Sequence, residues 1–141
     1  MPSFDSLPHS LSLTRDSARA ATRALAVVRA GLGVVALVAP AVLNVAWVGP
    51  LGKADGARVL GRAVGGRDLA LAAGILLAMR HETPVRGWVE GAGLADAADL
   101  VATIVSFRSL PRSRRWLVAA MAAGGVGASR LLSKAVDAEP A

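Results

Sequence analysis

The feature that most constrains the fold is an uncharged run over residues 30–52, which is 23 residues long, contains Pro40 and Asn44, and ends in the turn sequence Gly49-Pro50-Leu51-Gly52. As a helix rising about 1.5 Å per residue, this run would extend roughly 34 Å, slightly more than the hydrocarbon core of a bilayer. Pro40 would kink such a helix and free a backbone carbonyl. We therefore predict a transmembrane span over 30–52. A signal peptide is the alternative interpretation, but an unusually long segment would then precede the apolar run.

Three further segments have the length of a membrane span, and the two turns that separate them contain Pro84 and Pro111. These segments are 57–79, 87–107 and 116–132. Trp47, Trp88 and Trp116 lie near segment ends, where an indole with one polar N–H fits the headgroup region. The sequence therefore predicts four spans joined by short loops, an up-down helical bundle.

The composition supports an all-α protein. Hydrophobic residues make up 54% of the chain, which is too many for a disordered protein. Alanine and glycine together number 45, whereas aromatic residues are only 4%, so side-chain volume for a large soluble core is small. Alanine also dominates over the β-branched and aromatic residues that strands favour, which makes a β-rich fold improbable.

The ends of the chain differ from this apolar region. We expect residues 1–13 to form a flexible tail, because they contain prolines and serines without an apolar period. Over 14–28, Arg15, Arg19 and Arg23 fall on one helical face, which predicts a basic amphipathic extension, either on the membrane surface or solvated without lipid contact. The single helical domain then covers 14–133, and 134–141 form a second tail.

The net charge is +6, from 16 basic and 10 acidic residues. The arginines bracket the apolar segments and do not form one patch with aromatic residues, so they favour anionic lipid headgroups over nucleic acid. The chain has no cysteine, which excludes disulfides and thiolate metal sites. His9 and His81 have no partner at ligand spacing, and we expect neither a metal nor a cofactor.

Orientation follows from the basic residues outside the apolar segments. With both termini in the cytoplasm, eight lysines and arginines lie on the cytoplasmic side and six on the other. The positive-inside rule then favours cytoplasmic termini.

The second and third predicted spans contain charges that a bilayer would not accept singly. The five charged residues are Arg62, Arg67, Asp68, Asp96 and Asp99. Each costs about 2.5 to 3.5 kcal/mol at mid-membrane, so five unpaired charges would cost roughly 12 to 17 kcal/mol. Either these charges pair with one another, or these segments do not cross a membrane.

Helical geometry favours pairing. Two antiparallel helices joined near Thr83 would place Arg67 level with Asp99, and Asp96 within about one turn. We therefore predict that the forked guanidinium of Arg67 reaches both carboxylates. The small-residue pairs Gly61-xxx-Gly65 and Gly87-xxx-Gly91 would let these two helices approach closely.

The predicted network contains more carboxylates than guanidiniums, with Arg62 and Arg67 facing Asp68, Asp96 and Asp99, and with Glu90 nearer the membrane interface. Low dielectric disfavours the excess charge, which favours a protonated Asp. Two roles stay open. The network fixes the register of the hairpin, or it forms a polar pocket for a headgroup, a quinone-like or terpenoid ligand, or a proton relay.

The charged residues also resemble a known pattern, G-R-[DE]…G…W…G-D-x-x-D-L. The matching residues are Gly66-Arg67-Asp68, Gly74, Trp88 and Asp96-Ala97-Ala98-Asp99-Leu100. The pattern is similar to that of small uncharacterised four-helix membrane proteins of GC-rich bacteria, distantly DoxX-like. The chain departs from it at Ala95, where glycine is usual, and at Ala92, where relatives often carry arginine. The resemblance implies a four-helix fold in the bacterial cytoplasmic membrane and supplies no reaction.

Three functional hypotheses follow from the sequence. The first is a small-ligand or lipid-binding module, or an accessory subunit, with the bilayer, a small apolar ligand or a membrane protein as its partner. The second is a membrane enzyme, such as an isomerase or cyclase, in which protonated Asp96 or Asp99 acts as the general acid. The third is a soluble alanine-rich helical interaction protein. Self-association is left open.

Overall fold

The computed structural model describes residues 14–138, and these residues are helical without a strand. The predicted tail over 1–13 and residues 139–141 lie outside this range. The elements are α1 (Arg15–Val38), α2 (Pro40–Val48), η1 (Gly49–Lys53), α3 (Asp55–Arg80), α4 (Arg86–Val105) and α5 (Arg115–Ala135). The all-α prediction is confirmed.

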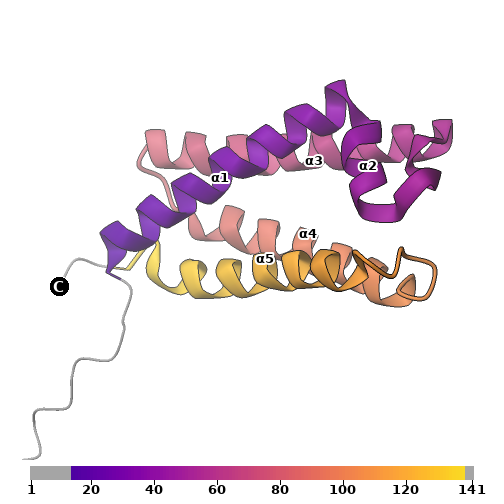
Figure 1. Ribbon diagram of the computed structural model, residues 1–141. Helices are drawn as coiled ribbons and strands as arrows, with labels where there is room; N and C mark the ends of the chain where they lie inside the picture. Colours follow the sequence, from indigo (N-terminus) through magenta and orange to yellow (C-terminus); the bar gives the residue numbers. More distant parts are fainter. Residues whose placement is uncertain (1–13, 139–141) are drawn as a thin grey trace, which may run out of the picture.

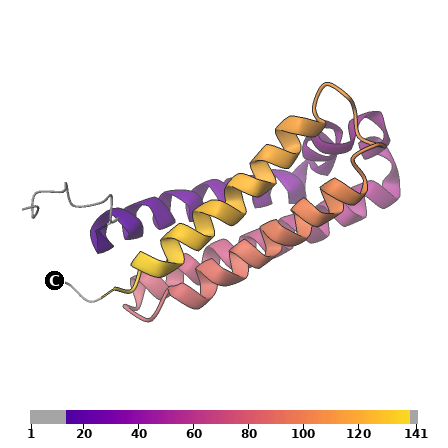
Figure 2. The same cartoon turned by 90° about the horizontal axis from the view of Figure 1, so that it is seen from below.

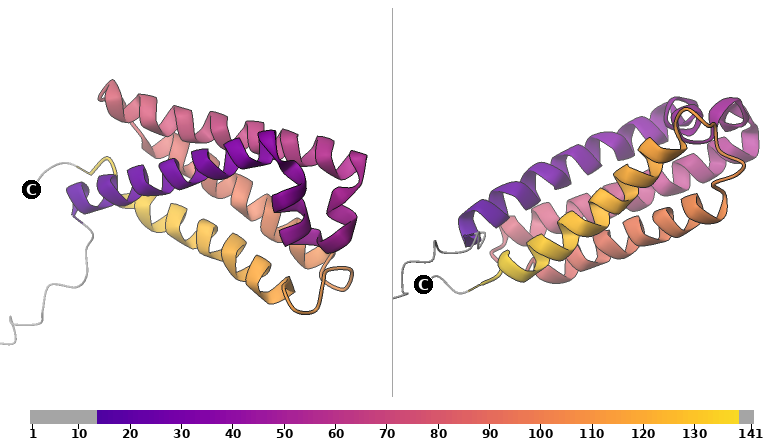
Figure 3. Two further views of the ribbon diagram at one scale, coloured as in Figure 1. Left: turned by 45° about the horizontal axis from the view of Figure 1, so that its top comes forward. Right: turned by 60° about the horizontal axis from the view of Figure 1, so that its bottom comes forward.

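The four long helices form two antiparallel pairs. Helix α1 packs along α3, and α4 packs along α5, with fewer contacts between the pairs (Figure 1). We call these the α1/α3 layer and the α4/α5 layer. The start of α1, the end of α5 and the turn between α3 and α4 lie at one end of the molecule (Figures 2 and 3). Helix α2 and η1 close the opposite end.

The predicted single span over 30–52 is wrong, because the chain breaks at Ala39. The residue before a proline disfavours helical backbone angles, and Ala39 has φ −132° and ψ 60°. Pro40 then starts α2 at the first helical position, where its missing N–H costs nothing. The predicted basic extension and the first part of the predicted span instead form one helix, α1. Thr14 caps this helix by accepting a hydrogen bond from the Ser17 N–H.

The other three segments match the prediction within a few residues, and α5 extends three residues beyond its predicted end at 132. Residues that follow also pack on the bundle, although the sequence suggested a tail from 134. Val136 is fully buried, and the Asp137 carboxylate accepts hydrogen bonds of 2.8 Å from the N–H groups of Val85 and Arg86. Asp137 therefore caps the start of α4 from the far end of the chain.

Glycines bring α1 and α3 together. A Cβ atom on Gly65 would lie 2.8 Å from the Gly33 carbonyl oxygen and 2.8 Å from the Ala36 Cβ, so only glycine fits there. Gly61 faces Asn44 of α2 in the same way. The expectation that this glycine row would pack against the third predicted span is therefore wrong, because the row faces α1 and α2.

The other predicted glycine pair also makes little close contact. A Cβ atom on Gly87 would meet nothing within 4 Å, and one on Gly91 would reach Leu71 only at 3.7 Å. Helices α3 and α4 instead approach at Gly74, whose surface is covered by the Trp88 ring.

Two helices, α1 and α5, are long and apolar enough to cross a membrane, with mean hydropathies of 1.7 and 1.2 over their best windows. Only 22% and 28% of those windows are buried within the bundle. Helices α3 and α4 do not meet that test, and both contain the charged residues of the site described below.

Candidate functional site

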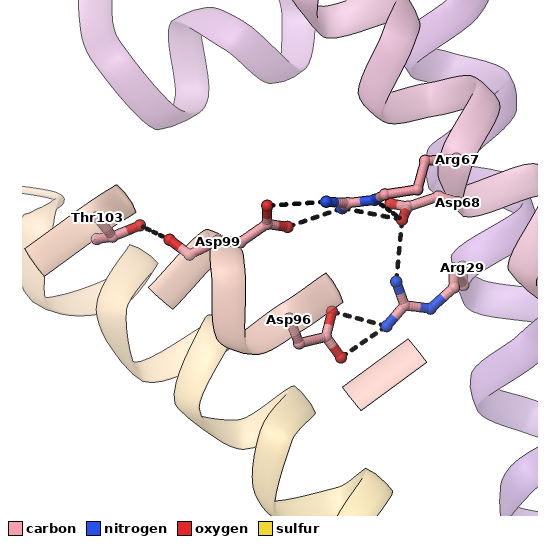
Figure 4. Close-up of polar contacts among 6 residues, drawn as sticks. All are labelled: Arg29, Arg67, Asp68, Asp96, Asp99 and Thr103. Carbon is pink, nitrogen blue, oxygen red and sulfur yellow. Dashed lines mark hydrogen bonds and ion pairs between the residues drawn. The ribbon is translucent and has the colours of Figure 1, made fainter. Parts of the chain in front are cut away.

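Five charged side chains from three helices meet between the two layers (Figure 4). We call them the ion cluster: Arg29 of α1, Arg67 and Asp68 of α3, and Asp96 and Asp99 of α4. Their side chains are between 14% and 31% exposed. The cluster is therefore largely removed from solvent.

Arg29 joins the two layers. Its Nη2 donates to both carboxylate oxygens of Asp96, at 2.7 and 2.6 Å. Its Nη1 donates to Asp68 Oδ1 at 2.9 Å. One arginine on α1 thus holds a carboxylate of its own layer and another from the opposite layer.

Arg67 forms the second connection. Its two terminal nitrogens donate to the two oxygens of Asp99 at 3.0 and 2.8 Å, the fork geometry that suits a guanidinium and a carboxylate. Its Nε and Nη2 also donate to Asp68 Oδ1, at 3.2 and 3.1 Å. The predicted level pairing of Arg67 with Asp99 is therefore present in the structure.

The remaining predicted contacts differ. Arg67 was expected to reach Asp96 as well, but Asp96 pairs with Arg29. Arg62 lies outside the ion cluster, is exposed, and donates to the Leu37 carbonyl oxygen at 3.2 Å. Glu90 is also exposed and accepts from Arg86, one helical turn before it, at 2.7 Å.

Arg29 was missed because the sequence placed it at the edge of an uncharged run, as a flanking charge. In the structure α1 begins at Arg15, and its buried face is formed by residues three or four apart: Ala18, Thr22, Ala26, Gly33 and Ala36. Arg29 lies three residues after Ala26 and four before Gly33, so it falls on this inward face. That small-residue spacing is the sequence signal that could have identified it.

Helix α5 leaves room for the Asp96 carboxylate, whereas the hydrogen bond beside Asp99 lies within α4 and uses the Asp99 backbone. A Cβ atom on Gly125 of α5 would lie 2.5 Å from Asp96 Oδ2, so the glycine leaves the space that this carboxylate occupies. The Asp99 carbonyl oxygen accepts a hydrogen bond of 2.7 Å from the buried Thr103 hydroxyl, one turn later on α4.

The ion cluster has an excess of one negative formal charge, from three carboxylates and two guanidiniums. The sequence predicted the same excess of one negative charge, but it counted Arg62 as the second guanidinium, whereas in the structure this guanidinium is Arg29. The expectation that one Asp is protonated stays a prediction.

A pocket of about 200 Å³ lies against the ion cluster, between α1, α3, α4 and α5. Its polar wall contains Arg29, Asp68, Asp96 and Asp99. The rest of the lining is mostly apolar, including Ile75, Val89, Ala122 and Leu132. Apolar walls with a few convergent polar groups are typical of small-molecule sites.

In the part of the chain that the structure describes, no group of three or more His, Cys, Asp or Glu residues is arranged to hold a metal ion. The three carboxylates of the ion cluster are engaged by arginine, and His81 lies exposed in the turn after α3. His9 lies outside the described residues.

The chain matches no protein-family model, no curated protein and no solved structure. The resemblance to DoxX-like membrane proteins therefore stays a prediction. Six of the residues that carry it lie in two contacts of the structure. Arg67, Asp68, Asp96 and Asp99 belong to the ion cluster, and Gly74 lies under the Trp88 ring.

Proposed function

We propose that the protein is a small four-span protein of the bacterial cytoplasmic membrane that binds a small ligand between its two helical layers. The observation that carries the proposal is the pocket itself, an apolar space of about 200 Å³ with the ion cluster as one wall. A ligand-binding protein needs such a pocket, and the ion cluster places fixed polar groups in the pocket wall.

Exposed apolar side chains support a location in the bilayer. Large hydrophobic residues are exposed on all four long helices, among them Val35, Leu60, Leu94 and Leu117 at 38%, 69%, 73% and 62%. Soluble monomers rarely expose apolar surface of this extent, and a bilayer would cover it. The short α2 would then lie near one membrane surface.

The ion cluster also explains how α3 and α4 could cross a bilayer despite their charges. Arg67, Asp68, Asp96 and Asp99 turn toward one another and toward Arg29, so none of them needs to face lipid. Arg62 lies near the α2 end of α3, where a long side chain can extend to the interface. We keep the orientation with cytoplasmic termini as part of this proposal.

The pocket volume limits the ligand. An engineered cavity of about 150 Å³ accommodates benzene, so this pocket has room for a somewhat larger molecule with one ring or a short chain. A complete lipid would not fit, although one of its groups could.

Two measurements test the proposal: fractionation shows whether the protein is in the membrane, and mass spectrometry shows whether it keeps a bound small molecule. We expect the protein to stay with membranes after a carbonate wash and to require detergent for extraction. Native mass spectrometry of the extracted protein should then show a bound small molecule. Ala128→Leu should abolish this adduct, because Ala128 lines the pocket and a larger side chain would fill it.

Ala123→Leu is the matched control, since Ala123 lies on the exposed face of the same helix, and the adduct should persist in it. Recovery of the protein in the soluble fraction without detergent would contradict the membrane location. An adduct that survives Ala128→Leu would place the ligand elsewhere.

A further inference from the structure

We infer that the ligand is a small organic cation, a protonated amine with an apolar body, and that its nitrogen pairs with Asp68. This inference rests on the proposed function, because it names the ligand class of the same pocket. It follows from the charge of the pocket wall, from the unequal use of the Asp68 oxygens, from the apolar rim and from a buried hydroxyl.

The guanidiniums of the ion cluster are already engaged. Both terminal nitrogens of Arg29 donate to Asp68 or Asp96, and both terminal nitrogens of Arg67 donate to Asp68 or Asp99. An anionic ligand would have to displace one of these carboxylates. A cation would instead neutralise the excess negative charge of the ion cluster, in place of the proton that the sequence predicts on one Asp, so the wall favours a cation.

Asp68 is the carboxylate of the ion cluster whose two oxygens are used unequally. Its Oδ1 accepts three hydrogen bonds, one from Arg29 and two from Arg67. Its Oδ2 accepts none from residues 14–138. Asp96 and Asp99, in contrast, use both oxygens. Asp68 lines the pocket and therefore offers an acceptor to a donor group on the ligand.

The rim of the pocket is apolar. Leu25 and Leu32 of α1 and Met121 of α5 line it and are 46%, 42% and 57% exposed, whereas Ile75, Val89 and other lining residues are buried. The opening therefore lies between α1 and α5, on a surface that lipid would cover in a membrane. An amine with an apolar body can enter by this route, and a fully hydrated ion cannot.

Thr22 supplies an independent observation. It lines the pocket, is 2% exposed, and its Oγ1 has no hydrogen-bond partner among the described residues. The equally buried Thr103 instead donates to the carbonyl oxygen one turn earlier. An unpaired buried hydroxyl is unfavourable, and a polar group on an occupant of the pocket would satisfy it. Thr22 precedes Arg29 by seven residues, or about 10 Å along α1, so a second polar group at the far end of the ligand would meet it.

Tyramine and tyrosol test the inference, because they share a phenol at one end and differ at the other, where one has an ammonium and the other a hydroxyl. Isothermal titration calorimetry on the full chain in dodecyl maltoside, with protein-free micelles subtracted, gives both dissociation constants. We expect tyramine to bind about tenfold more tightly, because its ammonium forms an ion pair with the Asp68 carboxylate whereas the tyrosol hydroxyl forms only a hydrogen bond with it.

Two variants separate the two ends of the ligand. Asp68→Asn keeps the shape of the side chain and removes the excess charge, so it should abolish the preference for tyramine by weakening tyramine binding much more than tyrosol binding. Thr22→Val removes the hydroxyl and should weaken both compounds by a similar factor of a few. The comparison in the unaltered protein stands even where a variant does not fold.

The outcomes distinguish this inference from the proposed function. Equal binding of tyramine and tyrosol would overturn the inference that the ligand is a cation, and the proposal of a binding pocket would stand. Failure of both compounds to bind would also overturn the proposal that this pocket binds a small ligand. A tyramine preference that persists in Asp68→Asn would overturn the assignment to Asp68.

Discussion

Replacing Arg29 with methionine is expected to lower the free energy of unfolding by about 3 kcal/mol, the cost of leaving a buried charge without its partner. Asp68 and Asp96 both lose a donor in this variant, and the cluster then contains three carboxylates and only one guanidinium. The value is near the low end for buried pairs, because these side chains retain 14% to 17% exposure. Equilibrium unfolding in mixed micelles, followed by circular dichroism, measures it.

Arg62→Met is the matched control for this experiment. Arg62 is also an arginine of the α1/α3 layer, but it is exposed and makes one hydrogen bond to a backbone carbonyl. We expect its substitution to change the unfolding free energy by no more than about 0.5 kcal/mol. Equal losses in the two variants would mean that Arg29 has no special role in joining the layers.

The second large effect concerns the contact between α1 and α3. Gly65→Ala should lower the unfolding free energy by about 2 to 3 kcal/mol, as overpacking does in a close-packed interior. The new methyl would meet the Gly33 carbonyl oxygen and the Ala36 Cβ, each at 2.8 Å, and neither can move without shifting the backbone. Thermal unfolding in detergent would show the loss.

The next residue provides the control. A Cβ atom on Gly66 would meet nothing within 4 Å, so Gly66→Ala should be neutral or should stabilise the helix by about 0.5 to 1 kcal/mol. Both variants gain the same helix propensity, and they differ only in what the methyl meets. Similar shifts in both would show that α1 and α3 do not approach at Gly65.

Sequence patterns predicted those parts of the fold that depend on local rules. Turn sequences placed the limits of α3 and α4 within about two residues, and antiparallel geometry paired Arg67 with Asp99. Both results depend only on helix rise and on a short connection between the helices.

The contacts between distant helices could not be predicted in this way. A row of glycines such as Gly61 and Gly65 shows that another backbone approaches, but it does not say which one, and here it is α1 and α2 rather than α4. Arg29 was assigned to a flank because hydropathy treats 30–52 as one unit, whereas the backbone preference of the residue before Pro40 ends α1 at Val38. Arg29 is recognised as inward-facing only when the helix is extended back to Arg15, because the buried residues before it then show which face points inward. The apolar run alone does not contain these residues.

The central claim is that an arginine of α1 and a carboxylate of α4 hold the two layers together beside the pocket. A double-mutant cycle with Arg29→Met and Asp96→Asn measures this coupling directly, from the unfolding free energies of the unaltered protein, both single variants and the double variant. We predict a coupling energy of about 2 kcal/mol, with the double variant less destabilised than the sum of the single variants. Losses that add to within about 0.5 kcal/mol, the behaviour of independent sites, would contradict the account.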